Sequence, residues 1–255
     1  MISSRILPAA RAFRLPMGDC SIDSLISVPV LNSLQVTGRD STHVLEIADP
    51  RCVLDRRAAQ ALVALRNAAR AASIELEIVS GFRDFNRQVA IWTAKFNGER
   101  PLLDRCGAVI SPAKLYESEL IDAILIWSAL PGASRHHWGT EIDVIDRAAL
   151  PADARARLLP EEFACGGVFE RLHGWLDSNM GRFGFFRPYA TDRGGVQPEP
   201  WHLSYAPVSV AALKMLSLEV LREAIETAAM PGQQTVLARL PELYERYVVN
   251  VDEPT

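Results

Sequence analysis

The chain has 255 residues, of which 49% are hydrophobic and 23% charged, and this composition is typical of a globular protein with a full core. The formal net charge of −4 excludes a broad basic surface, so nucleic acid is not an expected partner. Every apolar run is shorter than the roughly 18 residues that a membrane-spanning helix needs, so no transmembrane segment is expected.

The N-terminus and the cysteines bear on the compartment. The first twenty residues contain arginines but no continuous apolar stretch of about 7–15 residues, so no cleavable secretory signal is visible. We therefore expect a cytoplasmic protein, with the periplasm or cell envelope as the alternative if export uses another route or the chain starts further upstream. Scattered cysteines without a C-x-x-C pair favour reduced thiols, and two disulfides are the alternative. The four are Cys20, Cys52, Cys106 and Cys165.

The first hundred residues predict two helices separated by one strand. Residues 55–72 have helical apolar spacing, and Asp55 can cap this helix. Apolar and charged residues alternate over 75–80, which predicts a strand. Asp84 can cap a second helix, which Gly98 ends.

The rest of the chain predicts further helices and short strands in irregular order. The helices are expected over 117–129, 169–180 and 208–229, with a shorter one after Pro231, and the strands over 138–145, 184–189 and 201–205. Because these elements do not repeat as βαβ units, we predict an α+β fold with a small, largely antiparallel sheet flanked by helices. We expect three parts: an N-terminal extension packing on the core (1–54), the core (55–206) and a C-terminal helical extension (207–255).

Three segments concentrate the residue types of a metal hydrolase. They are Ser80–Gln88 (SGFRDFNRQ), Ser134–Asp143 (SRHHWGTEID) and Pro198–His202 (PEPWH). A catalytic zinc takes three protein ligands and a water, and His136, Asp143 and His202 would supply nitrogen, oxygen and nitrogen. Gly139 lets the chain turn between the first two, so that Asp143 can point back from the following strand.

Glu199 and Arg83 are the candidates for the chemistry beside the metal. Glu199 lies between two prolines, and the extended geometry that they favour would place it on the same side as His202. An unbound carboxylate near the metal can act as the general base of a zinc hydrolase, whereas an exposed glutamate in a proline-rich turn is the alternative. Arg83 joins a strand to a capped helix and can face a developing oxyanion, unless it is an ordinary surface arginine.

Together the segments resemble the D-alanyl-D-alanine metallopeptidases of the VanY and VanX type, which share a core with lysostaphin-type enzymes and the hedgehog signalling domain. The family pattern is S-x-H-x-x-G-x-A-x-D, then E-x-W-H, with S-G-[YF]-R upstream. The matching stretches are Ser134–Asp143, Glu199–His202 and Ser80–Arg83, in the same order and with the same spacing. The resemblance covers roughly residues 55–206.

The resemblance implies a role for each matching residue. His136, Asp143 and His202 would bind zinc, Glu199 would be the catalytic acid and base, and Arg83 would stabilise the transition state and help to hold the substrate. The fold implied is a hedgehog/D-Ala-D-Ala-peptidase-like sheet flanked by helices, in agreement with the predicted elements.

Other positions of the same segments are expected to serve the substrate or the metal ligands. By resemblance, Gln88 and Ser134 are substrate-binding positions. Glu141 departs from the pattern, because the family usually has alanine there. On a strand it faces the same side as Asp143, so it would orient a ligand histidine, meet a substrate amine or alter the metal preference, unless it simply reaches solvent.

The activity implied by the resemblance is that of a zinc-dependent D,D- or L,D-carboxypeptidase that hydrolyses the peptide bond at the D-alanine end of peptidoglycan stem peptides or muropeptide fragments. Specificity is expected in the loops 96–116 and 146–169. A peptidoglycan endopeptidase with the same core is one alternative, and a non-catalytic zinc-binding module is another, although it would not need Glu199 and Arg83. A non-haem iron oxygenase also uses two histidines and a carboxylate, but its H-x-D spacing is absent. The oligomeric state is open.

Overall fold

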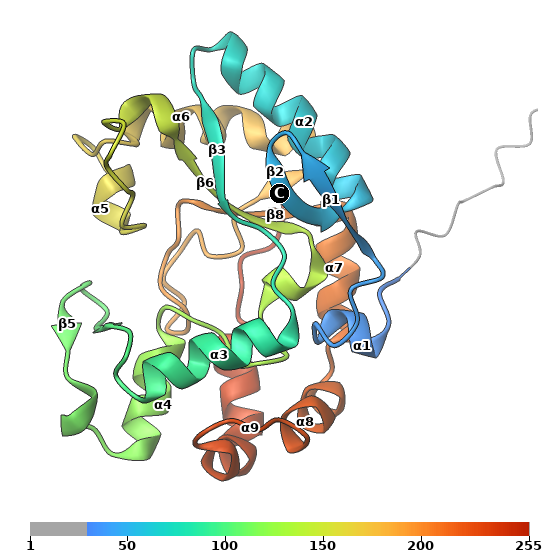
Figure 1. The fold of residues 1–255 in the computed structure, drawn as a ribbon, viewed down its shortest axis with the longest axis vertical. Coiled ribbons are helices and arrows are strands. Elements are labelled where there is room, and N and C mark those ends of the chain that lie inside the picture. The colour runs from blue at the N-terminus through green and yellow to red at the C-terminus, as the bar shows by residue number, and fades with distance from the viewer. Residues whose placement is uncertain (1–29, 255) are drawn as a thin grey trace, which may run out of the picture.

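The computed structural model describes residues 30–254 and has helices and strands in two halves (Figure 1). Most of the predicted extension 1–54 and Cys20 therefore lie outside the described residues. Cys52, Cys106 and Cys165 form no disulfide with one another. Within 30–254, no helix combines the length and the apolarity that crossing a membrane requires.

The order of elements confirms the predicted α+β class. The helices are α1 (Ser33–Val36), α2 (Arg56–Ala71), α3 (Phe85–Phe96), α4 (Glu117–Leu125), α5 (Pro160–Phe163), α6 (Glu170–Asn179), α7 (Ala206–Met215), α8 (Leu218–Glu226) and α9 (Gln233–Tyr247). The strands are β1 (Val44–Ala48), β2 (Arg51–Asp55), β3 (Leu76–Ser80), β4 (Leu102–Leu103), β5 (Val109–Ile110), β6 (Glu141–Asp146), β7 (Phe185–Phe186) and β8 (His202–Tyr205).

Local signals set several of these boundaries. The side chains of Asp55 and Asp84 cap α2 and α3 by accepting hydrogen bonds from backbone N–H groups of the first turn. The prediction of a single helix over 208–229 is wrong, because Ser217 caps a new helix and divides the region into α7 and α8. The helix after Pro231 is α9, which is longer than either of them and not the short helix that we expected.

The main sheet is small and antiparallel, with strand order β3-β6-β8-β7. Successive residues of a strand face opposite sides, so each side of this sheet has its own character. Ile142, Val144 and Leu203 enter a hydrophobic core that also contains side chains of α2 and α6. The intervening residues Asp143 and His202 face the other side. One face of the sheet is therefore core, and the other is free to carry polar groups.

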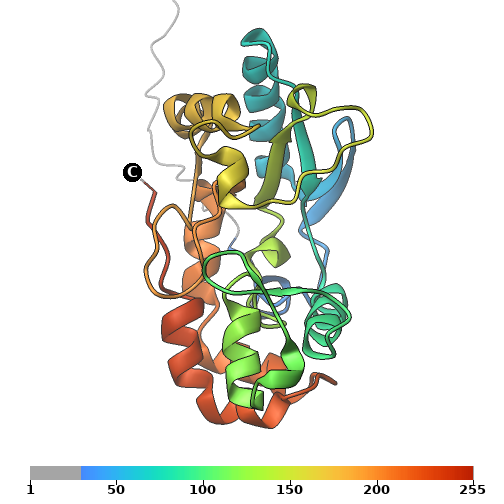
Figure 2. The same ribbon diagram turned by 90° about the vertical axis from the view of Figure 1, so that its left-hand side faces the viewer.

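The lower half in Figures 1 and 2 is helical and has a separate hydrophobic core. This core joins Trp92 of α3, Ile121 of α4, Ile225 of α8 and Leu240 of α9. The C-terminal helices thus pack together with α3 and α4, which precede the sheet strand β6 in the chain. The two β-hairpins, β1–β2 and β4–β5, lie outside the main sheet.

Strand register brings three distant segments together. Asp143 of β6 pairs with His202 of β8 on one side and with Ser80 of β3 on the other, where the register shifts at a bulge between Ile78 and Ser80. All three segments singled out by sequence therefore meet at one end of the sheet.

Candidate metal centre

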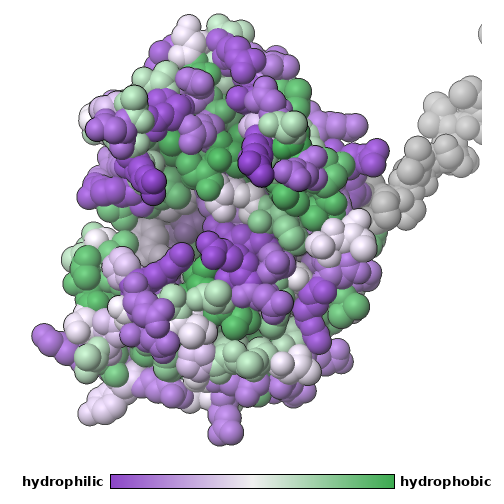
Figure 3. All heavy atoms as spheres, viewed as in Figure 1, coloured by the Kyte–Doolittle hydropathy of each residue, from purple (hydrophilic) through white to green (hydrophobic). Residues whose placement is uncertain are grey.

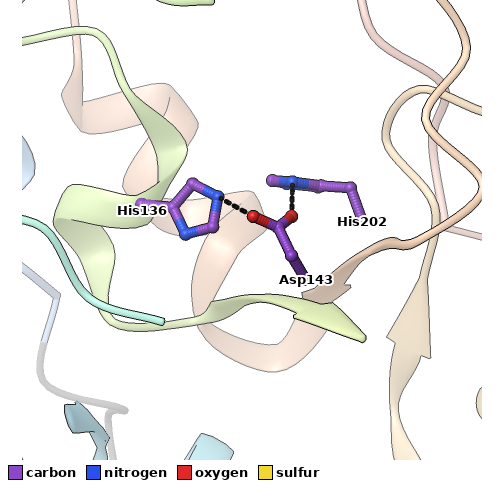
Figure 4. Close-up of side chains that lie close together, drawn as sticks. All are labelled: His136, Asp143 and His202. Atoms are coloured by element: carbon purple, nitrogen blue, oxygen red, sulfur yellow. Dashed lines mark hydrogen bonds and ion pairs between the residues drawn. The ribbon is translucent and has the colours of Figure 1, made fainter. Parts of the chain in front are cut away.

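The imidazoles of His136 and His202 lie on either side of the Asp143 carboxylate (Figure 4). His136 Nε2 is 3.4 Å from Asp143 Oδ2, and His202 Nδ1 is 3.0 Å from Asp143 Oδ1. One ligand atom from each residue lies within 4.8 Å of the others. Ligands bound tetrahedrally at about 2.0–2.1 Å lie roughly 3.3 Å apart, so this cluster needs only small side-chain movements to hold one zinc-sized ion.

A left-handed turn carries the chain from His136 to Asp143. His136 lies in a short 3-10 helix, Arg135–Trp138, which ends at Gly139 with φ +67°. A Cβ atom on Gly139 would lie 2.4 Å from a Val44 side-chain carbon, so a larger residue would strain both the backbone and its packing. The chain then enters β6, where Asp143 faces back toward His136.

The Ser80–Arg83 segment fixes the orientation of His136. Nδ1 of His136 is 2.8 Å from the backbone oxygen of Gly81. Because a carbonyl oxygen only accepts, Nδ1 carries the proton and Nε2 presents its lone pair toward Asp143. The backbone N–H of Arg83 donates to the His136 carbonyl at 3.2 Å, which holds the two segments together.

The electrostatics of the cluster favour a bound cation. Burial alone would lower the pKa of His202, but hydrogen bonds with Asp143 and Glu141 outweigh it and raise the pKa to about 10. For Asp143, burial acts to raise the pKa, yet the two imidazoles lower it well below its usual range. Two buried carboxylates thus hold a proton on the imidazole between them, and a metal ion can replace that proton on the Asp143 side.

Glu199 lies beside the cluster without being part of it. Its Oε2 is 3.6 Å from His202 Nδ1, and its backbone N–H donates to Tyr189 at 2.9 Å. The turn that follows is closed by His202, whose N–H donates to the Glu199 carbonyl. Burial raises the pKa of Glu199 to about 7, with a further contribution from the negative charge of Asp143.

Arg83 reaches the other side of the cluster. Its Nη2 is 3.2 Å from Asp143 Oδ2, and both Nη2 and Nε donate to the Ser80 hydroxyl. The side chain is partly exposed to the cleft. It brings a positive charge to the edge of the cluster.

The other two predicted site residues, Ser134 and Gln88, lie at different depths. Ser134 lines the cleft in front of the cluster. Gln88 is fully buried, and its amide Nε2 donates to the backbone oxygen of Ala129 at 2.8 Å. Ala129 itself lines the cleft, so the structure places Gln88 one layer behind that wall.

The cluster opens into a cleft of about 260 Å³ between the two halves of the molecule, where the surface in Figure 3 is hollowed. The cleft is also lined by Leu103, Trp127, Ser128, Ala129 and Val196, of which Trp127 stacks on Trp201. Arg157 and Leu158 reach it from the loop between β6 and α5. Both loops in which we expected specificity thus contribute, whereas the 127–129 segment carried no recognisable motif.

The chain is similar to several known proteins. The VanY family model, described as D-alanyl-D-alanine carboxypeptidase, matches residues 51–208. An uncharacterised Haemophilus influenzae protein is 34% identical over 122 residues, which are 47% of this chain and 93% of that protein. A D-alanyl-D-alanine carboxypeptidase of Enterococcus faecalis is 30% identical over 162 residues, and the match spans 62% of this chain and half (50%) of that relative.

A solved structure, VanYB in complex with D-alanine-D-alanine, aligns with a TM-score of 0.46 at 26% identity and covers 72% of this chain and 88% of that chain. The family model spans more than half of the chain and includes all three segments that build the cluster. The resemblance seen in the sequence is thereby confirmed, and the chain belongs to the VanY D-alanyl-D-alanine carboxypeptidase family of peptidases.

Proposed function

We propose that this protein is a zinc-dependent carboxypeptidase that hydrolyses the peptide bond at the D-alanine end of peptidoglycan stem peptides. The observation that carries the proposal is the buried trio of His136, Asp143 and His202 with Glu199 next to it, all in one cleft. Family membership supports the same class of substrate.

The donor set fits zinc. Two imidazole nitrogens and one carboxylate oxygen match a catalytic zinc site, which leaves a position open for water or substrate. When bound there, zinc lowers the pKa of a water molecule to about 7 and polarises the scissile carbonyl. His136 Nε2 and His202 Nδ1 both face Asp143, so the three ligands can close on the ion from one side.

Glu199 is proposed as the catalytic base and acid. Its carboxylate lies 3.6 Å from a ligand nitrogen, close enough to reach a water at the open position. Glu199 would take the proton of the attacking water and then deliver it to the leaving amine nitrogen. The raised pKa suits both steps near neutral pH.

Arg83 is proposed to stabilise the transition state. Its guanidinium contacts Asp143 and faces the cleft, where negative charge develops on the carbonyl oxygen during attack. Ser134, at the cleft surface, is proposed to contact the substrate. Gln88 would act through Ala129, whose backbone it holds.

The size of the cleft supports removal of a terminal residue. A volume of about 260 Å³ lies just below the usual range of roughly 300–1,000 Å³ for ligand pockets, and it suits a small ligand such as the end of a short peptide. Leu103 and Trp127 line the same cleft and can provide apolar contacts for the methyl side chains of alanine residues.

The proposal is tested by incubating the zinc-loaded protein with synthetic tri-, tetra- and pentapeptide stems and identifying the products by mass spectrometry. We expect about one zinc per chain and loss of a single terminal D-alanine. Loss from the pentapeptide indicates D,D-specificity, and loss from the tetrapeptide indicates L,D-specificity. Cleavage only inside cross-linked dimers would replace the proposal with an endopeptidase, and a zinc-loaded protein inert toward every stem and dimer would refute it.

A further inference from the structure

We propose that Glu141 is a positioning residue of the metal centre, which holds the His202 imidazole with Nε2 protonated and Nδ1 directed at the metal. This inference rests on the proposed function, because it assumes that His202 is a metal ligand. It assigns a role to the glutamate that stands where the family pattern has alanine.

The first step is the position of Glu141 on the sheet. Glu141 and Asp143 lie on the same face of β6, and His202 and Ser204 face them from β8, with Asp143 opposite His202 and Glu141 opposite Ser204. The His202 ring therefore lies between two carboxylates. Its Nδ1 is 3.0 Å from Asp143 and its Nε2 is 2.9 Å from Glu141.

The second step is the proton on the ring. An ionised carboxylate only accepts hydrogen bonds, so Nε2 of His202 donates to Glu141. Nδ1 faces the Asp143 carboxylate, and on that side, where Glu199 also lies, a metal ion can take the place of the Nδ1 proton. Glu141 is on the far side of the ring from that point, so it acts on the ligand and not on the metal.

The third step is the set of partners around the Glu141 carboxylate. Its side chain is 0% exposed. The Arg135 guanidinium lies next to it and balances its buried negative charge. The Oε1 atom accepts from Thr140 at 3.0 Å and from Ser204 at 2.8 Å, with Arg135 Nη2 at 3.4 Å.

The supporting residues are themselves fixed. Arg135 also donates to the Ser204 hydroxyl at 2.7 Å, and its guanidinium stacks on the Trp138 ring at 4.6 Å. The Ser204 and Ser209 hydroxyls lie 2.8 Å apart. A buried glutamate and arginine gain little stability over apolar residues of the same size. The network contacts the proposed metal site through the hydrogen bond between Glu141 and His202.

The test measures zinc affinity, not turnover. Dissociation constants are determined by competition with a chromophoric chelator for the wild type, Glu141→Ala, Glu141→Gln and the control Ser209→Ala. We expect Glu141→Ala to weaken zinc binding by about 10–100-fold. Glu141→Gln should weaken it less, because the amide oxygen can still accept from Nε2. Ser209→Ala alters the same buried network at a point remote from His202, and its affinity should match that of the wild type.

A second measurement reports on the ring itself. In zinc-loaded wild-type protein labelled with ¹⁵N-histidine, NMR should show the His202 Nε2 protonated and Nδ1 bound to zinc. A purely structural role of Glu141 would lower the melting temperature of the metal-free protein and leave the zinc dissociation constant unchanged. The wild-type spectrum and the Gln variant keep the inference testable even if Glu141→Ala does not fold.

The outcomes separate the inference from the function on which it rests. If the wild type binds zinc and cleaves stem peptides while Glu141→Ala binds zinc equally well, Glu141 is not a positioning residue and the proposed function stands. Zinc bound through Nε2 of His202 would overturn the inference in the same way. A wild type that binds no zinc would overturn the proposed function and this inference together.

Discussion

The two walls of the cleft present different kinds of atoms. The wall on the sheet side holds His136, Asp143, His202 and Glu199, whose side chains are buried and contact one another or the backbone. On the helical side, the lining includes Leu103 and Val196, and Val196 belongs to the hydrophobic core of that half. The sheet side is backed by the other core, against which Trp127 packs while it stacks on Trp201.

The difference indicates that the two walls have different roles, one in the chemistry and the other in substrate selection. On the sheet side, charged groups are fixed by neighbouring strands, and a movement of one disturbs all the others. On the helical side, the lining contributes shape and apolar surface, and one side chain can change without disturbing a hydrogen-bonded network. We therefore expect changes in the sheet wall to abolish chemistry and changes in the helical wall to alter which peptide is accepted.

The largest effect is expected for His136→Ala. The substitution removes one of the three proposed ligands, so the purified variant should contain little zinc and should be less active than the other variants. Metal content by mass spectrometry and turnover of the preferred stem peptide are the measurements. Undiminished zinc in a folded variant would remove His136 from the ligand set.

A large loss with the metal retained is expected for Glu199→Ala. Because Glu199 lies beside the ligand cluster and not in it, the variant should hold about one zinc and lose about 10²–10⁴-fold in kcat. Steady-state kinetics and metal content on the same sample provide the check. Full turnover would show that another group carries the proton.

A moderate and selective effect is expected for Leu103→Ala in the helical wall. The loss of apolar contact should lower kcat/KM for the preferred stem by about 10-fold, mostly through KM, and leave zinc content unchanged. Val109 pairs with Leu103 across the β4–β5 hairpin and is 73% exposed, so Val109→Ala is the matched control and should be neutral. A loss of zinc in Leu103→Ala would contradict the division between the walls.

The smallest effect concerns Lys95 of α3, a cation on the helical side whose Nζ lies 3.4 Å from the Trp127 carbonyl. Burial lowers the pKa of Lys95 to about 8, against an opposing contribution from Glu199. The folded state therefore binds fewer protons than the unfolded state between about pH 8 and 10.5, and wild-type stability should rise with pH in that window. Lys95→Met should stabilise the protein at pH 7 by about 1–3 kcal/mol, and less near pH 10.

Urea unfolding at pH 7 and pH 10 measures this difference. Lys114→Met removes an exposed lysine and is the control. Equal stability of the Lys95 variant and the wild type at pH 7 would show that the ammonium group is well solvated.

Part of the molecule was predictable from local signals. Asp55 and Asp84 cap helices where the sequence predicts helix starts, and the α+β class follows from the irregular order of elements. The break at Ser217 was not foreseen, because apolar spacing continues through it, although Ser217 is a residue type that caps helices and does cap α8. The β4–β5 hairpin was missed because each strand has only two residues.

The candidate site was predictable to a different degree. The sequence motifs include His136, Asp143 and His202, so these residues could be selected from sequence alone. The structure brings them together. Helical position could not show whether Gln88 reaches the cleft or lies behind it, because that depends on the path of the 127–129 segment. For Glu141, the alternatives stayed open in the sequence, because its partners Ser204 and His202 belong to a strand that only the sheet brings near.

The register between β6 and β8 has one further consequence. Asp143 and His202 are paired across adjacent strands, so the separation between them is set by the backbone ladder and not by the chain that connects them. Residues 147–201 connect the two strands, contribute only the short strand β7 to the sheet, and include Arg157, Leu158 and Tyr189 at the cleft. Insertions and deletions in residues 147–201 can change the shape of the cleft entrance, while the pairing of β6 with β8 keeps Asp143 and His202 at the same separation. Substrate preference can therefore change while the proposed metal site keeps its geometry.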